Sequence, residues 1–205
     1  KYVYNIIGKD YPRAKLDAFI SACAARRALR DVRVGTMGYR DMLLFGTQYE
    51  GNSMRGQLGV EVEPYEMLEM VRALDTLEPD KIAEGVKYVK ETWKFEKPCD
   101  EAIIEKGVKY ALAIGKKITE RGWEAITLLD VDGMKKLEGF PPAMVFILLE
   151  HYYHVLTTPE NDVMGCVTQL IMKYLSGQTV PYLEYYEFFE NSMIAGLPDY
   201  IPEPV

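Results

Sequence analysis

The stretch WEAITLLDV, residues 123–131, decides the fold, because it is the clearest buried strand in the sequence. The pattern before it predicts a helix over Cys99–Arg121, and Gly122 follows as a C-cap glycine. The pattern after it predicts a helix over Pro141–Tyr153, which begins with two prolines. A buried strand between two helices is typical of an α/β protein.

The same alternation extends over the rest of the chain. We predict helices over 12–30, 41–45, 64–74, 80–93 and 162–175, and strands over 2–7, 32–35, 57–62, 155–158 and 178–189. Strands that alternate with helices predict a mostly parallel sheet with helices on both faces, as in Rossmann-like domains. We expect this α/β domain to cover residues 1–197.

The C-terminal residues 198–205 have a different character. Three prolines among them cannot continue a strand or a helix, so this segment is expected to be a connector to another domain. The chain also starts at Lys1. We therefore expect a piece of a longer protein, with further domains on both sides.

Composition excludes several classes of partner. The net charge of -7 and the pI of about 5.0 argue against binding to nucleic acid, because an acidic surface repels phosphates. No apolar run approaches the roughly 20 residues that a membrane span needs. The cysteines are far apart and form no CxxC pair, which predicts free thiols in a cytoplasmic protein.

Acidic side chains follow two of the predicted strands. They are Asp130, Asp132 and Glu138 in the first loop, and Glu160 and Asp162, with the neutral Asn161 between them, in the second. Ligands of open α/β sheets bind at the carboxyl ends of strands, so Glu138 and Asp162 would face one another if the strands are neighbours. Two such carboxylates hold a hard divalent cation or act as acid and base on a polyol. The alternative is that Asp162 caps a helix and Glu138 is solvated.

Two further groups of residues have open alternatives. His151 and His154 have a spacing that allows a shared metal, although packing against neighbouring tyrosines or a role at the helix C-terminus fits them better. An aromatic cluster near the end of the chain would stack on a sugar, fill a core or form a subunit interface. Its members are Tyr182, Tyr185, Tyr186, Phe188 and Phe189.

The segment ENDVMG, residues 160–165, is followed by an apolar helix and LSGQ, residues 175–178, and it resembles the E-N-D-x-x-G segment of L-fucose isomerases. The segment LEG, residues 137–139, resembles the one that supplies a metal-binding glutamate in that family. The separation of 24 residues between Glu138 and Asp162 is also similar. The stretch 33–38 and the strand predicted after it are similar to the start of the middle domain of L-fucose and L-arabinose isomerases.

The resemblance implies an aldose–ketose isomerase that binds Mn²⁺ or another divalent cation and acts on a monosaccharide through an enediol. It implies that Glu138 and Asp162 are metal ligands and the proton-transfer pair, with Glu160 and Asn161 as supporting groups. The third ligand would be a histidine in a C-terminal domain outside this sequence, and neither His151 nor His154 matches it. A homo-oligomer is expected. The alternative is a non-catalytic sugar-binding or oligomer-assembly domain.

Overall fold

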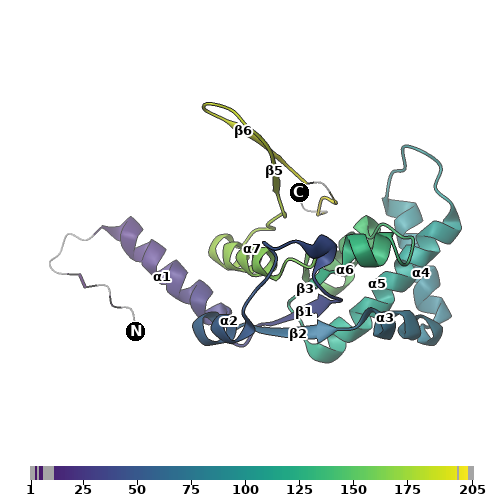
Figure 1. Ribbon diagram of the computed structural model, residues 1–205, viewed down its shortest axis with the longest axis horizontal. Helices are drawn as coiled ribbons and strands as arrows, with labels where there is room; N and C mark the ends of the chain where they lie inside the picture. The colour runs from purple at the N-terminus through teal and green to yellow at the C-terminus, as the bar shows by residue number, and fades with distance from the viewer. Residues whose placement is uncertain (1–2, 4, 7–11, 198, 203–205) are drawn as a thin grey trace.

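The computed structural model describes residues 3, 5–6, 12–197 and 199–202 (Figure 1). The helices are α1 (Arg13–Ala28), η1 (Asp41–Leu43), α2 (Gly51–Leu58), α3 (Met67–Ala73), η2 (Leu74–Thr76), α4 (Pro79–Thr92), α5 (Glu101–Arg121), η3 (Asp130–Lys135), α6 (Ala143–Tyr153) and α7 (Val163–Ser176). The strands are β1 (Arg33–Met37), β2 (Glu61–Tyr65), β3 (Ala125–Leu128), β4 (Leu156–Thr158), β5 (Glu184–Phe188) and β6 (Met193–Gly196). Within this described part, no helix combines the length and the apolar character that crossing a membrane would take.

The main sheet has four parallel strands in the order β2-β1-β3-β4. This confirms the predicted α/β class and the parallel sheet. From β1 the chain moves to β2 on one side, whereas from β3 it moves to β4 on the other side. The gap between the carboxyl ends of β1 and β3 is therefore the topological switch point, where open α/β sheets bind their ligands.

Helices cover both faces of the sheet, as predicted (Figure 1). On one face, α3, α4, α5 and α6 pack over Met37, Ile126 and Leu128, which are fully buried. On the other face, α2, α7 and the end of α1 pack near Val34 and Ala125. Successive strand residues thus serve opposite cores, as the alternation of side chains along a strand requires.

The region around residues 57–62 differs from the prediction. Its first part belongs to helix α2, which Glu50 caps by accepting the N–H groups of Asn52 and Ser53. Gly59 ends this helix with a left-handed φ of 90°, and the strand begins only at Glu61. Strand β2 includes Pro64, which an edge strand tolerates because one side of it needs no hydrogen bonds.

The two ends of the chain also differ from the prediction. The expected final strand, 178–189, is shorter and pairs with β6 in an antiparallel hairpin outside the main sheet. Figure 1 shows this hairpin projecting from the body. The strand expected over 2–7 falls on a stretch of which the structure describes only residues 3, 5 and 6. In the expected connector, Tyr200 is 9% exposed and stacks on Phe146.

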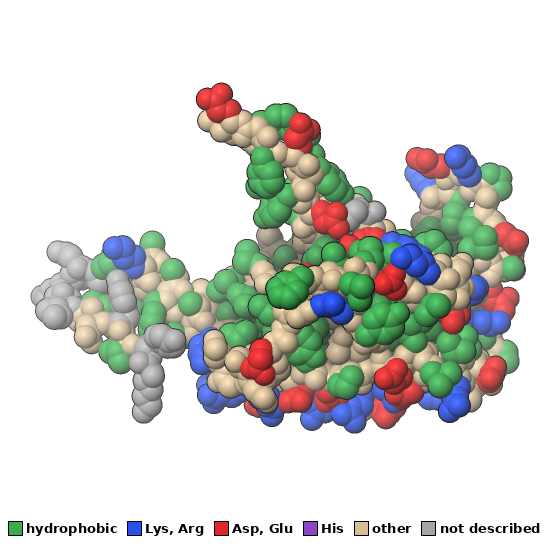
Figure 2. Space-filling model, in the orientation of Figure 1, with side chains coloured by type: hydrophobic (Ala, Val, Ile, Leu, Met, Phe, Trp, Pro, Cys, Tyr) green, Lys and Arg blue, Asp and Glu red, His purple; other side chains and the backbone are tan. Residues whose placement is uncertain are grey.

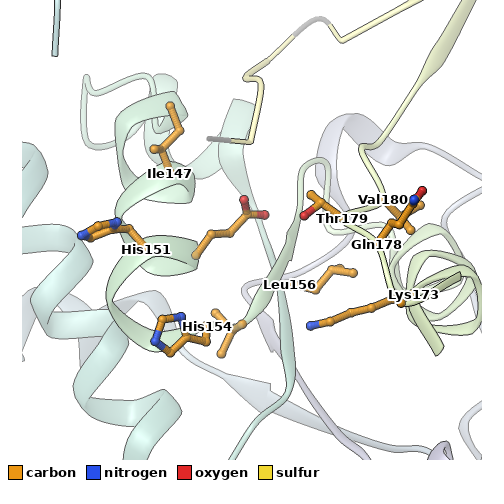
Figure 3. A pocket seen from close by; sticks show the side chains of 11 residues that line it. Ile147, His151, His154, Leu156, Lys173, Gln178, Thr179 and Val180 are labelled. Atoms are coloured by element: carbon orange, nitrogen blue, oxygen red, sulfur yellow. The ribbon is translucent and has the colours of Figure 1, made fainter. Parts of the chain in front are cut away.

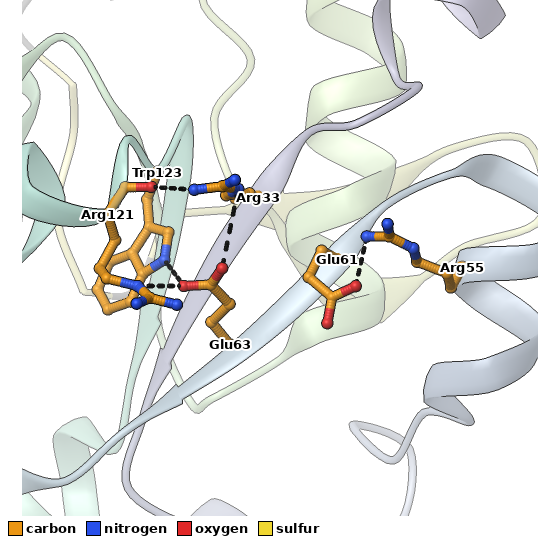
Figure 4. A network of polar contacts seen from close by, with 6 residues as sticks. All are labelled: Arg33, Arg55, Glu61, Glu63, Arg121 and Trp123. Atoms are coloured by element: carbon orange, nitrogen blue, oxygen red, sulfur yellow. Dashed lines mark hydrogen bonds and ion pairs between the residues drawn. The ribbon is translucent and has the colours of Figure 1, made fainter.

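A polar network ties β2 to the starts of β1 and β3 (Figure 4). The Glu63 carboxylate accepts from Arg121 Nε at 2.7 Å and from Trp123 Nε1 at 2.9 Å. Arg33 Nε lies 3.8 Å from its other oxygen. These donors lower the pKa of Glu63 below its ordinary value, and the hydrogen bond from Arg121 has the largest effect. The network therefore stabilises an ionised carboxylate beside the sheet.

Candidate functional site

Irregular backbone occurs at the carboxyl ends of β3 and β4, as it also does at Met42 and Leu43 after β1. A π-helix, η3, follows β3, and both Glu160 and Asn161 after β4 have left-handed φ angles, 59° and 51°. Left-handed residues other than glycine are uncommon and cost on the order of 1 kcal/mol or more each. Such strain and π-helical turns occur often at functional sites, so this edge is the candidate site.

Asn161 holds the loop after β4 in this strained form. Its backbone N–H donates to Leu128 O at 2.8 Å, and its side-chain Nδ2 donates to Tyr39 O at 2.7 Å. Its Oδ1 accepts from the Thr36 hydroxyl at 2.6 Å. Asn161 is only 6% exposed. These three bonds join the β4 loop to β1 and β3 and fix the position of the adjacent Glu160.

Asp130 and Glu160, called the acidic pair below, meet at this edge. Asp130 is fully buried, and its Oδ1 accepts the Glu160 N–H at 2.6 Å. Its Oδ2 lies 3.2 Å from Lys135 Nζ but has no well-aligned hydrogen-bond donor among the described residues. The same ammonium group donates to Asp199 at 3.1 Å. Asp130 therefore has fewer donors than a fully buried carboxylate needs.

Both carboxyls of the acidic pair have raised pKa values. Burial is the main cause that raises the pKa of Asp130 to about 6, against the lowering effect of the Glu160 N–H and of Lys135. Burial, followed by repulsion from Glu184 and Asp130, raises the pKa of Glu160 to about 7. Carboxyls that titrate near neutral pH are suited to both accepting and donating a proton.

Asp41 and Asp132 close the crevice at the switch point. The fully buried Asp41 carboxylate accepts the N–H groups of Val131 and Asp132, both at 2.8 Å. In return, Asp132 Oδ2 accepts the Met42 N–H at 2.9 Å. Asp132 therefore has a structural role in joining η1 to η3. Asp41 was not expected from the sequence, because it heads a short helix that gives no sign of its distant partners.

The structure gives Glu138 and Asp162 separate hydrogen-bond partners. Glu138 Oε2 accepts from the Tyr110 hydroxyl of α5 at 2.8 Å. Asp162 caps α7 by accepting the Gly165 N–H at 2.8 Å, and its Oδ2 accepts from the Tyr182 hydroxyl at 3.0 Å. Since α5 and α7 cover opposite faces of the sheet, the two carboxylates have no partner in common. Asp162 therefore caps a helix, which is the alternative given for it in the sequence analysis.

A divalent cation needs several oxygen donors around one point. Among residues 3, 5–6, 12–197 and 199–202, no group of three or more His, Cys, Asp or Glu side chains is arranged to hold a metal. The buried carboxylate oxygen that lacks an aligned donor belongs to Asp130, not to Glu138 or Asp162. The described donors thus do not make a complete metal site.

Two cavities lie near the carboxyl ends and the outer edge of the sheet. One of about 470 Å³ adjoins Asn161 and has polar side chains from Thr36, Arg40 and Gln48 in its wall. The other, of about 370 Å³, lies along β4 between α6 and α7, where Lys173 points across toward β4 (Figure 3). Both volumes fall within the range of small-molecule sites.

The two histidines have different roles, and among the described residues only His151 packs against aromatic rings. His151 stacks on Tyr88 with ring centroids 4.2 Å apart, and its Nδ1 is 3.1 Å from the Tyr88 hydroxyl. His154 ends α6 with a left-handed φ of 54°. These positions agree with the packing and helix-end alternatives.

The sequence matches no family model and no curated protein. The resemblance to L-fucose isomerases therefore depends on the short segments quoted above, 137–139 and 160–178. Asp130 was noted in the sequence but not selected. Its signal was its position at the end of the most apolar strand, where a buried acid needs a functional or structural reason.

Proposed function

We propose that this chain is a domain of an aldose–ketose isomerase and that Asp130 and Glu160 are its proton-transfer groups. The observation that carries the proposal is the fully buried Asp130 carboxyl, which accepts the Glu160 N–H at the carboxyl edge of the sheet. The resemblance around residues 160–178 supplies the reaction class. The geometry favours the acidic pair over Glu138 and Asp162, because both of those carboxylates already accept from tyrosine hydroxyls.

The chemistry of the reaction suits the acidic pair. Conversion of an aldose to a ketose removes a proton from C2 and returns one to C1, while a proton moves between the two oxygens. A carboxylate with a pKa near neutral accepts the carbon-bound proton, and a neighbouring protonated carboxyl serves the oxygen. Lys135, which lies 3.2 Å from Asp130 Oδ2, stabilises the negative charge that develops nearby.

The cavity beside Asn161 is the proposed sugar site. Its hydroxyl, guanidinium and amide groups match the hydroxyl groups of a monosaccharide. Asn161 lines this cavity, follows Glu160 directly in the chain and is bonded to both Thr36 and Tyr39. A sugar bound there would lie next to the loop that carries Glu160.

Proton exchange in D₂O tests the proposal most directly. The full chain is incubated with L-fucose, L-arabinose and D-arabinose, with and without Mn²⁺, and deuterium at C1 and C2 is followed by NMR. We expect slow exchange that falls about 100-fold or more in Asp130→Asn and Glu160→Gln. Glu61→Gln is the control, because Glu61 pairs with Arg55 on the exposed surface of β2. Equal exchange in all four proteins would overturn the assignment of the acidic pair.

A second candidate is sugar binding without turnover, and the polar cavity favours it because it does not depend on the acidic pair. Titration of the same sugars, followed by calorimetry, distinguishes the two. Binding that Gln48→Ala weakens, with no deuterium exchange in any protein, would support a binding domain. If the wild-type chain and Asp130→Asn catalyse deuterium exchange at the same rate, both the role of the acidic pair and the non-catalytic alternative are excluded.

Mn²⁺ is part of the proposal and has its own test. Calorimetric titration compares the wild-type chain with Glu138→Ala/Asp162→Ala and with Asp130→Ala. Weak binding that only the first variant loses would support the ligands that the resemblance implies. If only Asp130→Ala loses Mn²⁺ binding, the cation is assigned to the acidic pair instead. If none of the three proteins binds Mn²⁺, the cation is removed from the proposal for this chain.

A further inference from the structure

Among the described residues, helix α1 packs mainly against α7. Of its 16 residues, only Ala25 is buried, and Figure 1 shows the helix extending away from the body. Helices of this length are marginal in water unless one face packs against another element. Ile20 in its middle is 55% exposed. The helix thus presents a largely uncovered surface made of alanine and larger apolar side chains.

The β5–β6 hairpin has the same property. It forms a separate two-stranded sheet, and such hairpins are marginal alone. Its large apolar side chains are exposed: Tyr185 64%, Tyr186 54%, Phe188 70%, Phe189 51%, Met193 54% and Ile194 49%. Figure 2 shows these hydrophobic side chains along the projecting arm. An exposed apolar surface of this kind is typical of a contact with another protein.

The two elements carry opposite charges. Residues 184–196 contain Glu184, Glu187 and Glu190 and no lysine or arginine. Helix α1 contains four basic residues and one acidic residue: Arg13, Lys15, Arg26 and Arg27, and Asp17. Complementary charge on two uncovered surfaces favours their contact and opposes contact between like surfaces. An acidic hairpin would also be repelled by an anionic lipid surface.

We propose that the β5–β6 hairpin of one copy docks on helix α1 of a second copy. In a single chain the two elements project in different directions, so the contact needs another molecule (Figure 1). A twofold dimer then forms the contact twice, because each copy contributes one hairpin and one helix. The proposal is independent of the isomerase assignment.

Charge reversal tests the contact on the full chain by sedimentation velocity. The hairpin variant is Glu187→Lys/Glu190→Lys, and the helix variant is Arg13→Glu/Lys15→Glu. We expect the wild-type chain to form dimers and each variant alone to associate at least tenfold more weakly. An equimolar mixture of the two variants restores the dimer, because both contacts in the mixed pair are again complementary.

Matched controls keep the result specific. Lys81→Glu/Lys87→Glu reverses two exposed lysines on α4 and is expected to leave association unchanged. A covalent test uses the exposed Cys23 of α1 with Phe188→Cys in a Cys99→Ser background, where oxidation should link two copies. A monomeric wild-type chain, or a mixture of variants that stays monomeric, would overturn the proposal.

Discussion

Two carboxylate clusters lie near opposite ends of the same parallel sheet and differ in their supply of donors. Near the amino ends of β1 and β3, Glu63 accepts from Arg121 and Trp123 and lies close to Arg33 (Figure 4). At the carboxyl ends, Asp130 of the acidic pair shares Lys135 with Asp199. The pKa of Glu63 is lowered, whereas the pKa values of the acidic pair are raised.

The difference separates stability from function. A carboxylate with a full set of donors prefers to be ionised and stabilises the fold at neutral pH. A buried carboxyl that lacks donors is costly to ionise, and a protein keeps it where its proton is useful. The strained backbone at Glu160 and Asn161 adds to the cost at the second cluster only. We therefore expect the two clusters to respond in opposite ways to the loss of their charges.

The largest expected effect is on turnover. Asp130→Asn should reduce the proposed isomerisation about 100-fold or more, because a proton carrier is lost, while the free energy of unfolding at neutral pH stays the same or rises. Sugar exchange by NMR and urea unfolding measure the two quantities. Glu63→Gln is the matched change in the other cluster and should leave the exchange rate within about twofold. If Asp130→Asn lowers the free energy of unfolding as much as Glu63→Gln does, the proposed difference between the two clusters is wrong.

The next effect is on stability at Glu63. Glu63→Ala should lower the free energy of unfolding by about 2 kcal/mol, mainly because the Nε1–H of the nearly buried Trp123 loses its acceptor. Arg33 and Arg121 are about half exposed and will be hydrated instead. Glu61→Ala on the same strand is the control, and we expect about 0.5 kcal/mol or less because its pair with Arg55 is exposed. Equal losses at the two positions would contradict the role of the network.

Much of the fold was predictable from periodicity, whereas the site was only partly so. The helices around residues 123–131 were located correctly because their apolar patterns are strong, whereas the strand itself is shorter than predicted, Ala125–Leu128, and its expected end belongs to η3. Helix α2 was missed, since its sequence GNSMRGQL lacks a clear apolar face and depends on the cap by Glu50. The left-handed pair Glu160–Asn161 depends on bonds to Thr36 and Tyr39, which are more than a hundred residues away in sequence. No local pattern records such contacts.

The assignment of Glu138 and Asp162 illustrates the same limit. The condition set in the sequence analysis is met, because β3 and β4 are neighbours and their carboxyl ends lie together. Which side chain of each loop turns toward the shared edge depends on the path of the π-helix and on partners such as Tyr110 and Tyr182. Their roles as metal ligands stay a prediction. The acidic pair emerged only from burial and from the bond between Asp130 and Glu160.

The two clusters should also have opposite pH dependence. Glu160 has a folded-state pKa of about 7, above its ordinary value of 4.5, so its contribution to stability is complete below about pH 4.5 and is lost as pH rises through 7. Glu63 has a lowered pKa, so its contribution is present above its ordinary value and is lost as pH falls. Glu160→Gln should therefore flatten the fall in stability between pH 5 and 8, with a gain on the order of 1 kcal/mol at pH 8 for this partly exposed group. Urea unfolding at several pH values measures it, and an unchanged slope would contradict the prediction.

The smallest expected effect concerns a carboxyl of intermediate character. Glu150 is half-buried, and burial is the main cause that raises its pKa, yet it accepts from the hydroxyls of Thr157 at 2.8 Å and Tyr200 at 3.1 Å. The Tyr200 hydroxyl also lies 2.8 Å from Thr157 O, the alternative acceptor for its single proton, so it covers the outer edge of β4 where a further strand would otherwise bond. Tyr200→Phe should cost about 1 kcal/mol, because the ring keeps its stack on Phe146 and only the hydroxyl is lost.

Thermal and urea unfolding measure this cost beside Tyr185→Phe, whose ring is 64% exposed and whose hydroxyl should contribute nothing measurable. If Glu150 is supported by its donors in the way Glu63 is, its pKa should rise further in Tyr200→Phe, and the loss of stability should be larger at pH 8 than at pH 5. A loss that is the same at both pH values would mean that Tyr200 acts on the strand edge alone. Glu150 would then belong with the acidic pair, as a carboxyl that the fold buries without fully supporting its charge.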